Sequence, residues 1–428
     1  MDILLVNAPV KRKSRHSELA PPLGLLYIAT FLRSAGYVTK IIDLNLEGVD
    51  LPQVRTALAQ GRPGIIGISS FTETYPAALQ IAGLAKQVCP DTRVVMGGAH
   101  PSVLPRDVAS DDCVDFVVRG EGEYTFLELA GYILHGIGSL QDIAGIAYRQ
   151  GGEIKLNHER EFIQDPDALP LPERRLLPIT DYECRATILA SRGGCPYGCR
   201  YCAVNNIWKG KRRFRRPERV VEEMRCIIRD SISSEIVFVD DIFTLNRGYV
   251  LELCRIMNSA GKLNCEWKCT TRADLVDEEI LREMRGVGCA GITYGVEAGS
   301  QKILEIMDKR LTIDRIKMAV DQAQKAGIMV TCAFMFPHPE DTEETIREQM
   351  RFMKELADRE VQVSLSFTTP LPGTDYYERA EELGINILVD KWDEFDMSHI
   401  QISNRHLSRE KLAELEQEIY QYVGLVRY

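Results

Sequence analysis

The sequence predicts an α/β protein in which an N-terminal, Rossmann-like doubly wound parallel sheet is followed by a partial barrel of six β/α units and a small helical C-terminal region. Short apolar stretches alternate with helical stretches from residue 3 to residue 97, and again from residue 187 to residue 367. Glycines, hydroxyls and carboxylates gather where the expected strands end. The proline-rich segment 165–173 separates the two series and marks a boundary.

The first series enters a strand almost at once. Pro21-Pro22-Leu23-Gly24 opens a helix that runs to about Ser34, and a further helix spans Tyr75–Val88. A hairpin turns at Gly151-Gly152, between 145–149 and 153–156. The expected strands before that hairpin are Ile3–Asn7, Tyr37–Asp43, Gly64–Ser70 and Arg93–Gly97. Strands that alternate with helices at this spacing form a doubly wound parallel sheet.

A ligand of such a sheet lies beyond the carboxyl ends of its strands. The stretches at those ends, 7–9, 69–72, 97–101 and 119–123, are rich in glycine, hydroxyl and amide groups. Glycines let the backbone approach a ligand closely, and hydroxyls and free amides bind phosphate or amide groups. There is no GxGxxG after the first strand and no GxxxxGK[ST], so dinucleotide and P-loop sites are disfavoured.

The second series begins with a strand at 187–190 and contains helices at Pro217–Arg229 and Arg247–Ala260. Six β/α units fit a partial barrel better than a closed eightfold one, and its chemistry belongs at the carboxyl ends of the strands. The residues after 375 carry helices, including Arg409–Val423. The remaining strands expected are Glu235–Val239, Glu266–Thr270, Gly291–Gly295, Met329–Phe334 and Gln362–Phe367.

Three of the twelve cysteines, Cys195, Cys199 and Cys202, stand in the spacing C-x3-C-x2-C after the first strand of this series. Flanking glycines and a proline rule out a regular helix, so the thiols lie on a compact loop. Three thiolates leave an iron–sulfur cube one ligand short, whereas a closed structural site fills four positions. A zinc knuckle that borrows a distant fourth ligand is the alternative, although no CxxC or HxxxH partner follows.

This loop, with Tyr201 directly before the third cysteine, resembles the cluster loop of the radical S-adenosylmethionine (SAM) superfamily. The resemblance implies that Cys195, Cys199 and Cys202 hold a 4Fe–4S cluster. It also implies that the amino and carboxylate groups of SAM occupy the free iron, where reductive cleavage yields a 5'-deoxyadenosyl radical.

Three strand-end stretches of the second series are similar to the SAM-contacting strands of that superfamily: DDxFT at 240–244, TRAD at 271–274 and GVEAGSQ at 295–301. The resemblance implies that Asp240 or Asp241 binds the methionine ammonium of SAM, because carboxylates accept hydrogen bonds from an ammonium group. It implies that Glu297 and Asp274 bind the ribose hydroxyls of SAM. The other residues that it implies as SAM contacts are Arg272 for a carboxylate, Ser300, and Tyr201 and Phe336 for the adenine.

The first series resembles the cobalamin-binding domain that precedes the radical domain in cobalamin-dependent radical SAM enzymes, through its PPLGL, GISS and GGAHPSxLP stretches. The D-x-H-x-x-G motif that supplies a lower cobalt ligand elsewhere is absent, and the loop after the first strand has only His16. We therefore expect no histidine ligand there; His100 is a candidate contact or a loop cap. The implied cobalamin contacts are Asn7, Pro9, Leu23, Gly24, Ser69, Ser70, Gly97, Gly98, His100, Gly120 and Glu121.

These resemblances divide the chain into a cobalamin-binding domain at 1–150, a connector at 151–183, a radical SAM partial barrel at 184–375 and a helical region at 376–428. The implied function is methyl transfer from methylcobalamin to an unactivated carbon of a small-molecule or peptide substrate, with electrons from an external donor of the flavodoxin or ferredoxin type. Cyclisation, rearrangement or deoxygenation on the same scaffold is the alternative.

Two further alternatives have less support. A tRNA methylthiotransferase would need a second cysteine trio near the N-terminus, and only Cys89 and Cys113 precede Cys184. A zinc-stabilised RNA-binding protein would use the basic run at 209–216. The net charge of −10 disfavours a broad nucleic-acid surface.

The composition is that of a globular protein, with 45% hydrophobic and 27% charged residues. No run of about 18 apolar residues predicts a membrane span, and no basic leader opens the chain, so the expected compartment is the cytoplasm. The remaining cysteines are scattered singly, as in a reducing compartment.

His338 departs from the family pattern, because related chains usually have a glycine after the proline that is Pro337 here. Two roles are open for His338. It donates to substrate or cofactor, or it caps the helix that begins after Thr342.

Overall fold

The computed structural model describes residues 1–10, 18–261 and 263–424, which form two compact units. The first unit contains residues 1–10, 19–183 and 391–393, and the second contains the others. Each unit has its own sheet and its own buried core. His16, the histidine of the loop after the first strand, lies outside the described residues.

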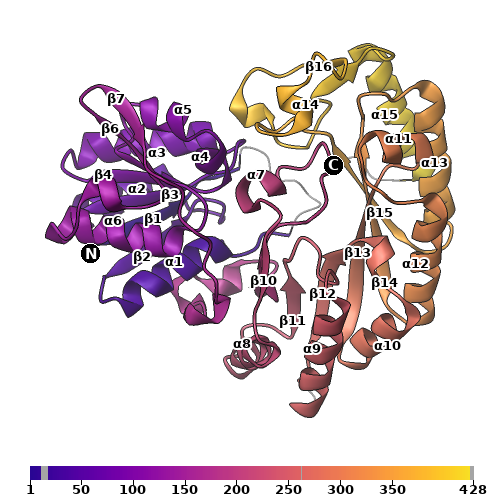
Figure 1. The fold of residues 1–428 in the computed structure, drawn as a ribbon, viewed down its shortest axis with the longest axis horizontal. Helices are drawn as coiled ribbons and strands as arrows, with labels where there is room; N and C mark the ends of the chain where they lie inside the picture. Colours follow the sequence, from indigo (N-terminus) through magenta and orange to yellow (C-terminus); the bar gives the residue numbers. More distant parts are fainter. Residues whose placement is uncertain (11–17, 262, 425–428) are drawn as a thin grey trace. The chain divides into compact units, whose positions relative to one another are not determined.

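The first unit is built on a seven-stranded sheet in the order β2-β1-β3-β4-β5-β6-β7 (Figure 1). The pairings from β2 to β5 are parallel, which confirms the doubly wound class. The hairpin of β6 and β7 was expected, but it joins the sheet as an antiparallel edge, which was not. The strands are β1 Ile3–Asn7, β2 Thr39–Asp43, β3 Ile65–Ser69, β4 Arg93–Gly97, β5 Phe116–Val118, β6 Ile146–Gln150 and β7 Glu153–Leu156.

Helices cover both faces of this sheet because alternate strand residues point to opposite faces. Leu4 and Val6 belong to a core that includes residues of α2 and α3. Ile3 and Leu5 belong to a second core that includes residues of α1 and α6. The helices are α1 Leu23–Ser34, α2 Leu51–Gly61, α3 Tyr75–Val88, α4 Ala99–Val103, α5 Pro105–Ser110 and α6 Gly122–His135.

The segment 157–183, which includes the proline-rich stretch 165–173, packs on the first unit. Glu173 donates its backbone N–H to Thr30 Oγ1 at 2.8 Å, and the Tyr182 hydroxyl donates to Asp43 Oδ2 at 2.9 Å. The segment contains three single turns of 3₁₀ helix, at 166–168, 174–176 and 179–181. Part of the predicted connector is strand β7 itself.

The second unit contains a six-stranded sheet in the order β15-β14-β13-β12-β11-β8 (Figure 1). All five pairings are parallel and the strands follow chain order, so the sheet is the expected partial barrel. The strands are β8 Thr187–Ile188, β11 Glu235–Phe238, β12 Glu266–Thr271, β13 Cys289–Glu297, β14 Met329–Phe336 and β15 Gln362–Phe367.

One continuous core joins the outer face of this sheet to its helices. Trp267, fully buried on β12, packs its ring 5.3 Å from the rings of Phe238 and Phe243. The inner-facing residues of the same strands, such as Val237 and Thr293, are half-buried. The helices are α8 Pro217–Arg229, α9 Arg247–Ser259, α10 Glu278–Gly286, α11 Gln301–Ile306, α12 Ile313–Lys325 and α13 Glu343–Ala357.

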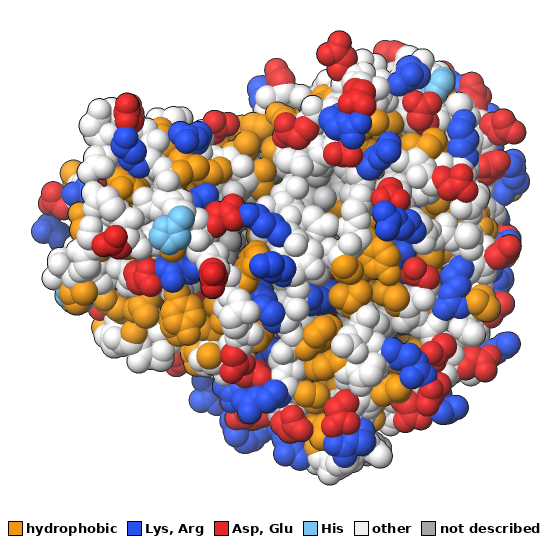
Figure 2. All heavy atoms as spheres, viewed as in Figure 1, with side chains coloured by type: hydrophobic (Ala, Val, Ile, Leu, Met, Phe, Trp, Pro, Cys, Tyr) orange, Lys and Arg blue, Asp and Glu red, His pale blue; other side chains and the backbone are white. Residues whose placement is uncertain are grey.

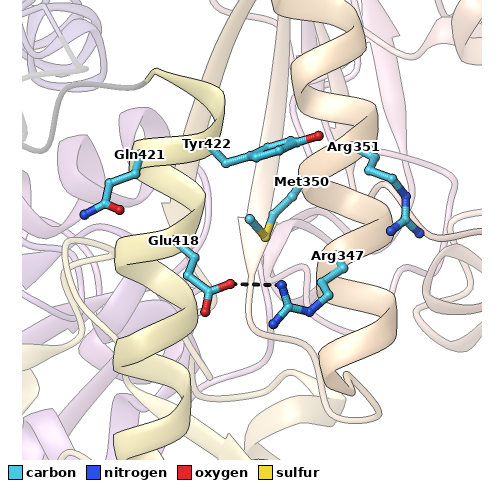
Figure 3. A pocket seen from close by; sticks show the side chains of 6 residues that line it. All are labelled: Arg347, Met350, Arg351, Glu418, Gln421 and Tyr422. Carbon is cyan, nitrogen blue, oxygen red and sulfur yellow. Dashed lines mark hydrogen bonds and ion pairs between the residues drawn. The ribbon is translucent and has the colours of Figure 1, made fainter.

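The C-terminal region is helical only in part, which corrects the prediction. Strands β16 Ile385–Ile387 and β17 Ile402–Asn404 pair antiparallel between α14 Asp375–Glu378 and α15 Arg409–Val423. Three-residue strands leave no periodic pattern in the sequence, so they were missed. Helix α15 packs beside α13, and a cavity of about 460 Å³ between them is lined by Arg347, Met350, Arg351, Glu418, Gln421 and Tyr422 (Figure 3).

Within the described residues, the helices are all too short or too polar to cross a membrane.

Candidate cofactor sites

The cysteine loop lies between the two strands of a small hairpin that the sequence did not predict. Strand β9 Ser191–Gly193 pairs antiparallel with β10 Arg212–Phe214, and the strand expected at 187–190 is only two residues long, at 187–188. Gly193 has φ 123°, and a Cβ there would lie 2.1 Å from the Lys211 carbonyl oxygen. A Cβ on Gly194 would lie 2.6 Å from the Trp208 side chain, in the short helix α7 Val204–Trp208. Both glycines are therefore required for the loop to close.

The three loop thiols are half-buried and form no disulfide. Burial raises the pKa of Cys195 and of Cys199, and it raises the pKa of Cys202 to about 11. Charge on Cys195 or Cys199 raises the pKa of Cys202 further, which shows that the thiols lie within electrostatic reach of one another. Lys309 and Arg272 act in the opposite direction on Cys199 and favour its thiolate.

The donor set fits an iron–sulfur cube. In the described part of the chain, no three His, Cys, Asp or Glu side chains are gathered closely enough to hold one metal ion. A structural zinc site brings four ligands to a single ion, whereas each thiolate of a cube binds its own iron. Three thiols on one loop match the donor set of a cluster that is held by three thiolates.

Asp240, at the end of β11, is a structural residue. Its carboxylate accepts from the backbone N–H groups of Ala190 and Ser191, each at 2.8 Å. The Ser191 hydroxyl and the Arg212 guanidinium, at 3.1 Å, also donate to it. Because the carboxylate is 4% exposed and holds β8, β9 and β10 together, Asp240 is not free for a ligand.

Asp241, the next residue, remains open to solvent beside the cysteine loop. Protein atoms around its carboxyl desolvate it and raise its pKa, while Arg212 partly offsets this effect. Its charge also raises the pKa of Cys195 and Cys202, so it lies within electrostatic reach of both thiols. Of the two adjacent candidates, the structure leaves Asp241 for a cation next to the cluster.

Arg272 and Asp274 satisfy each other. Two guanidinium nitrogens donate to the Asp274 carboxylate at 2.9 and 3.0 Å, and one of them donates to the Lys309 carbonyl at 2.8 Å. The guanidinium also lies 3.7 Å from the centroid of the Tyr197 ring, on the cysteine loop. Arg272 is buried and organises the loop, which corrects its expected pairing with a ligand carboxylate.

Glu297, at the end of β13, is paired with a lysine that sequence reasoning missed. Lys309 Nζ lies 3.0 Å from Glu297 Oε1 and 3.2 Å from the Tyr201 hydroxyl. Ser300 is 2% exposed, and its hydroxyl has no partner among the described residues. No sequence motif marked Lys309, and its partner Tyr201 lies 108 positions away in the chain.

Phe336 and His338 are both fully buried. The Phe336 ring packs 6.3 Å from Phe367 in the core, so the expected adenine contact has no exposed face on Phe336. His338 contacts the Tyr376 hydroxyl through Nδ1 at 3.4 Å and the Glu297 carbonyl through Nε2 at 3.5 Å. Burial lowers the pKa of His338. Of the two roles left open for His338, helix capping is wrong, because Thr342 caps α13.

The basic run 209–216 does not form a continuous basic face. Arg212 is bound to Asp240, and Arg215 donates to Glu223 at 2.6 Å with side chains that are 2% and 3% exposed. Acidic and basic side chains are interspersed over the face of the second unit that Figure 2 shows. The RNA-binding alternative therefore loses two of its arginines.

In the first unit, the candidates lie on the strand-end edge of the parallel sheet. Asn7 donates to the carboxylate of Asp43 at 2.9 Å, and Glu121 accepts from the Ile163 backbone N–H at 2.8 Å, so both have structural roles. A Cβ on Gly98, which has φ 103°, would lie 2.5 Å from the Ser70 carbonyl oxygen. Among the half-buried or exposed candidates at this edge are Pro9, Leu23, Gly24, Ser69 and Gly97.

Two buried polar atoms at this edge have no partner among the described residues, Ser70 Oγ and His100 Nε2. The His100 ring stacks on Tyr75 at 4.3 Å and contacts Thr72 Oγ1 through Nδ1 at 3.2 Å. Burial lowers the pKa of His100 to about 4, so the ring is neutral at pH 7. Buried polar atoms without a partner call for an explanation, and a hydrogen-bonding ligand at this edge would supply one.

Comparison with known proteins agrees with this geometry. Residues 17–130 match the B12 binding domain, and residues 191–353 match the radical SAM superfamily. An uncharacterized methyltransferase of Pyrococcus horikoshii is 31% identical over 429 residues, which cover 98% of this chain and 92% of that protein. The chain belongs to the cobalamin-dependent radical SAM enzymes.

Two further comparisons extend this assignment. The anaerobic magnesium-protoporphyrin IX monomethyl ester cyclase of Rubrivivax gelatinosus is 27% identical over 88% of this radical SAM enzyme and 68% of the cyclase. The structure of the methyltransferase TsrM from Kitasatospora setae, with cobalamin and a 4Fe–4S cluster bound, has a TM-score of 0.74 at 18% identity. That match covers 100% of this chain and 89% of TsrM, and it shows the same fold.

The cofactors of this radical SAM enzyme are a 4Fe–4S cluster, SAM and cobalamin. In the second unit, the loop with Cys195, Cys199 and Cys202 has the donor set for the cluster. In the first unit, Ser70 Oγ and His100 Nε2 are buried polar atoms without a partner among the described residues, at the strand-end edge of the sheet.

Proposed function

We propose that this enzyme transfers a methyl group to an unactivated carbon of a small-molecule or peptide substrate. One observation carries the proposal: a loop with three half-buried thiols stands in the same chain as a B12-binding unit. The cofactors supply the radical and the methyl donor, and the protein positions them and excludes water. Such a division of labour suits reactions at carbons that acid–base groups cannot activate.

The residues of the second unit have binding and orienting roles in this proposal. Asp241 accepts from the ammonium of SAM, since its carboxylate is open beside the cysteine loop. Glu297 contacts the ribose hydroxyls while its Oε1 accepts from Lys309. The unpaired hydroxyl of Ser300 donates to the same ligand.

A second function has a specific observation behind it. The similarity to a cyclase covers 88% of this chain, so ring formation without net methylation uses a closely related scaffold. The two functions differ in their products. Methylation consumes one SAM as a methyl donor and cleaves another, whereas cyclisation needs no S-adenosylhomocysteine.

The partners and compartment follow from the redox chemistry. Reductive cleavage of SAM needs an external one-electron donor, which we propose to be of the flavodoxin or ferredoxin type. All twelve cysteines are free, which suits a reducing compartment such as the cytoplasm. We retain the domain bounds 1–150, 151–183, 184–375 and 376–428 as part of this proposal.

The test is anaerobic incubation of reconstituted protein with SAM, a reductant and cobalamin. We expect about four irons per chain, and both 5'-deoxyadenosine and S-adenosylhomocysteine as products. Cys199→Ala should abolish 5'-deoxyadenosine, whereas Cys226→Ala, a half-buried thiol on α8, should not. Bound zinc without iron, or undiminished SAM cleavage by Cys199→Ala, would contradict the proposal.

A further inference from the structure

Lys309 stands on a turn that is docked onto the cysteine loop. Asp308 and Arg310, on either side of it, have φ of 54° and 53°, in the left-handed region that non-glycine residues rarely adopt. The Arg200 backbone N–H donates to the Met307 carbonyl at 3.2 Å, and Cys199 Sγ lies 3.8 Å from the Asp308 carbonyl oxygen. The turn therefore contacts the cysteine loop at Cys199, one of the proposed cluster ligands.

The backbone of this turn is held from the barrel side as well. Arg272 donates to the carbonyls of Lys309 and Arg310 at 2.8 and 3.3 Å. The Lys309 backbone N–H donates to the Leu304 carbonyl at 2.9 Å, in helix α11. Strained backbone persists where the surroundings determine it, and it clusters at functional sites.

The side chain of Lys309 is 6% exposed, which is unusual for a lysine. Its ammonium donates to Glu297 Oε1 at 3.0 Å and to the Tyr201 hydroxyl at 3.2 Å, and it lies 5.9 Å from the Tyr201 ring centroid. A buried ammonium is costly unless it is paired, so these contacts fix its position. The cation thus joins the cysteine loop to the end of β13.

The backbone of β13 leaves room for the ion pair between Lys309 and Glu297. A Cβ on Gly295 would lie 2.7 Å from Glu297 Oε1 and 3.4 Å from Lys309 Nζ. The pairing of β13 with β14 shifts register between Gly295 and Glu297, and Glu297 itself has φ 71°. The absence of a side chain at Gly295 and the irregular pairing that follows it together direct the Glu297 carboxylate toward the Lys309 ammonium.

We infer that Lys309 is a positioning residue of the SAM site. Its ammonium holds Glu297 toward the ribose hydroxyls and places a fixed positive charge beside the cluster loop at Cys199. That charge stabilises the reduced, more negative cluster and so raises its midpoint potential. The inference rests on the proposed function, because it takes Glu297 as the ribose contact and the loop as the cluster site.

The experiment uses reconstituted full-length protein and three variants. Lys309→Met keeps the length of the side chain and removes its charge, Lys309→Arg keeps the charge, and Gly295→Ala keeps both charged groups but displaces them. The readouts are the cluster midpoint potential from an EPR-monitored titration and the Kd for SAM. Lys317→Met is the matched control, since Lys317 pairs with Glu355 at 2.8 Å on the protein surface.

We expect Lys309→Met to lower the midpoint potential and to weaken SAM binding about tenfold. Lys309→Arg should restore the potential, and Gly295→Ala should weaken SAM binding without lowering the potential. Lys317→Met should change neither. If Lys309 were merely structural, its variants would not change the midpoint potential and the Kd for SAM independently of each other.

Wild-type potential and SAM affinity in Lys309→Met with full iron content would overturn the inference. If Lys309→Met binds no cluster, the Gly295→Ala variant provides the test. An unchanged Kd for SAM in Gly295→Ala would then overturn the inference. Wild-type protein that holds the cluster and cleaves SAM keeps the proposed function, whatever these variants do. Wild-type protein without a cluster would remove the proposed function and this inference together.

Discussion

At the scale of single residues, two identical neighbours at the end of β11 have different roles. Asp240 accepts from Ala190, Ser191 and Arg212 and is buried. Asp241 has an open carboxylate in reach of two cluster thiols. Their positions in the sequence are equivalent, so only the partners distinguish a structural carboxylate from a binding one.

We predict that Asp241→Asn weakens SAM binding about tenfold, because a charge-assisted hydrogen bond to the ammonium is lost. The pKa of the Asp241 carboxyl is raised by desolvation, so its ionised form is lost at a higher pH than in an ordinary aspartate. The affinity of wild-type protein for SAM should therefore fall as the pH decreases into the acid range, with a smaller change in Asp241→Asn. Calorimetric titration across this range measures both effects.

Asp240→Asn is the matched variant for that prediction. It removes one partner of a buried ionic network, which costs about 3–5 kcal/mol of unfolding free energy. Urea denaturation should show this loss, whereas Asp241→Asn should unfold almost as the wild type does. Equal losses of stability in the two variants would contradict the assignment of roles.

At the scale of elements, α8 is tied to the barrel by one buried ion pair. Arg215 donates to Glu223 at 2.6 Å and to the Leu189 carbonyl at 2.8 Å, and both charged side chains are almost inaccessible. The helix begins at Pro217, a residue favoured in the first turn. The pair joins this helix to the strand that leads into the cysteine loop.

We predict that Glu223→Gln lowers the free energy of unfolding by about 3–5 kcal/mol, because it removes the negative charge from a buried ion pair. Glu222→Gln on the same helix is the control. Glu222 pairs with Arg219 at the surface, with side chains 54% and 24% exposed, and such pairs contribute about 0–1 kcal/mol. Urea denaturation of both variants tests the difference, and similar losses would refute it.

At the scale of the whole molecule, the two cofactor sites lie in two compact units. The candidate cobalamin edge belongs to the seven-stranded sheet, and the cysteine loop belongs to the six-stranded one. Each unit has its own core, so one site should survive damage to the other.

We predict that Gly98→Ala loses the visible absorbance of bound cobalamin and keeps the iron content of wild-type protein. The added Cβ would collide with the Ser70 carbonyl oxygen at the strand-end edge. Replacement of Cys195, Cys199 and Cys202 by alanine should have the opposite effect. Gly138→Ala, also at positive φ but with nothing within 4 Å of its Cβ, should keep both cofactors.

Loss of both cofactors in Gly98→Ala would show that the sites are not independent. Circular dichroism of each variant separates that outcome from unfolding. Retention of cobalamin in a folded Gly98→Ala protein would move the cobalamin site away from this edge.

The sequence alone determined the fold class, the family and the cysteine loop. Alternation of strands with helices and the C-x3-C-x2-C spacing are local patterns, so they can be read without knowing which segments meet. Helices α3, α8 and α15 begin and end at the residues that were predicted. Short strands such as β16 and β9 were missed, because three residues are too few to show a periodic pattern.

Only the tertiary structure decided which candidates are available to a ligand. It assigned Asp240 and Arg272 to internal networks, buried Phe336, and revealed Lys309. The physical reason is that burial and pairing join residues distant in sequence: Lys309 meets Tyr201 across 108 positions. A sequence shows which groups are present, but it is packing that determines whether a charge is already neutralised by a neighbour or remains open to a cofactor.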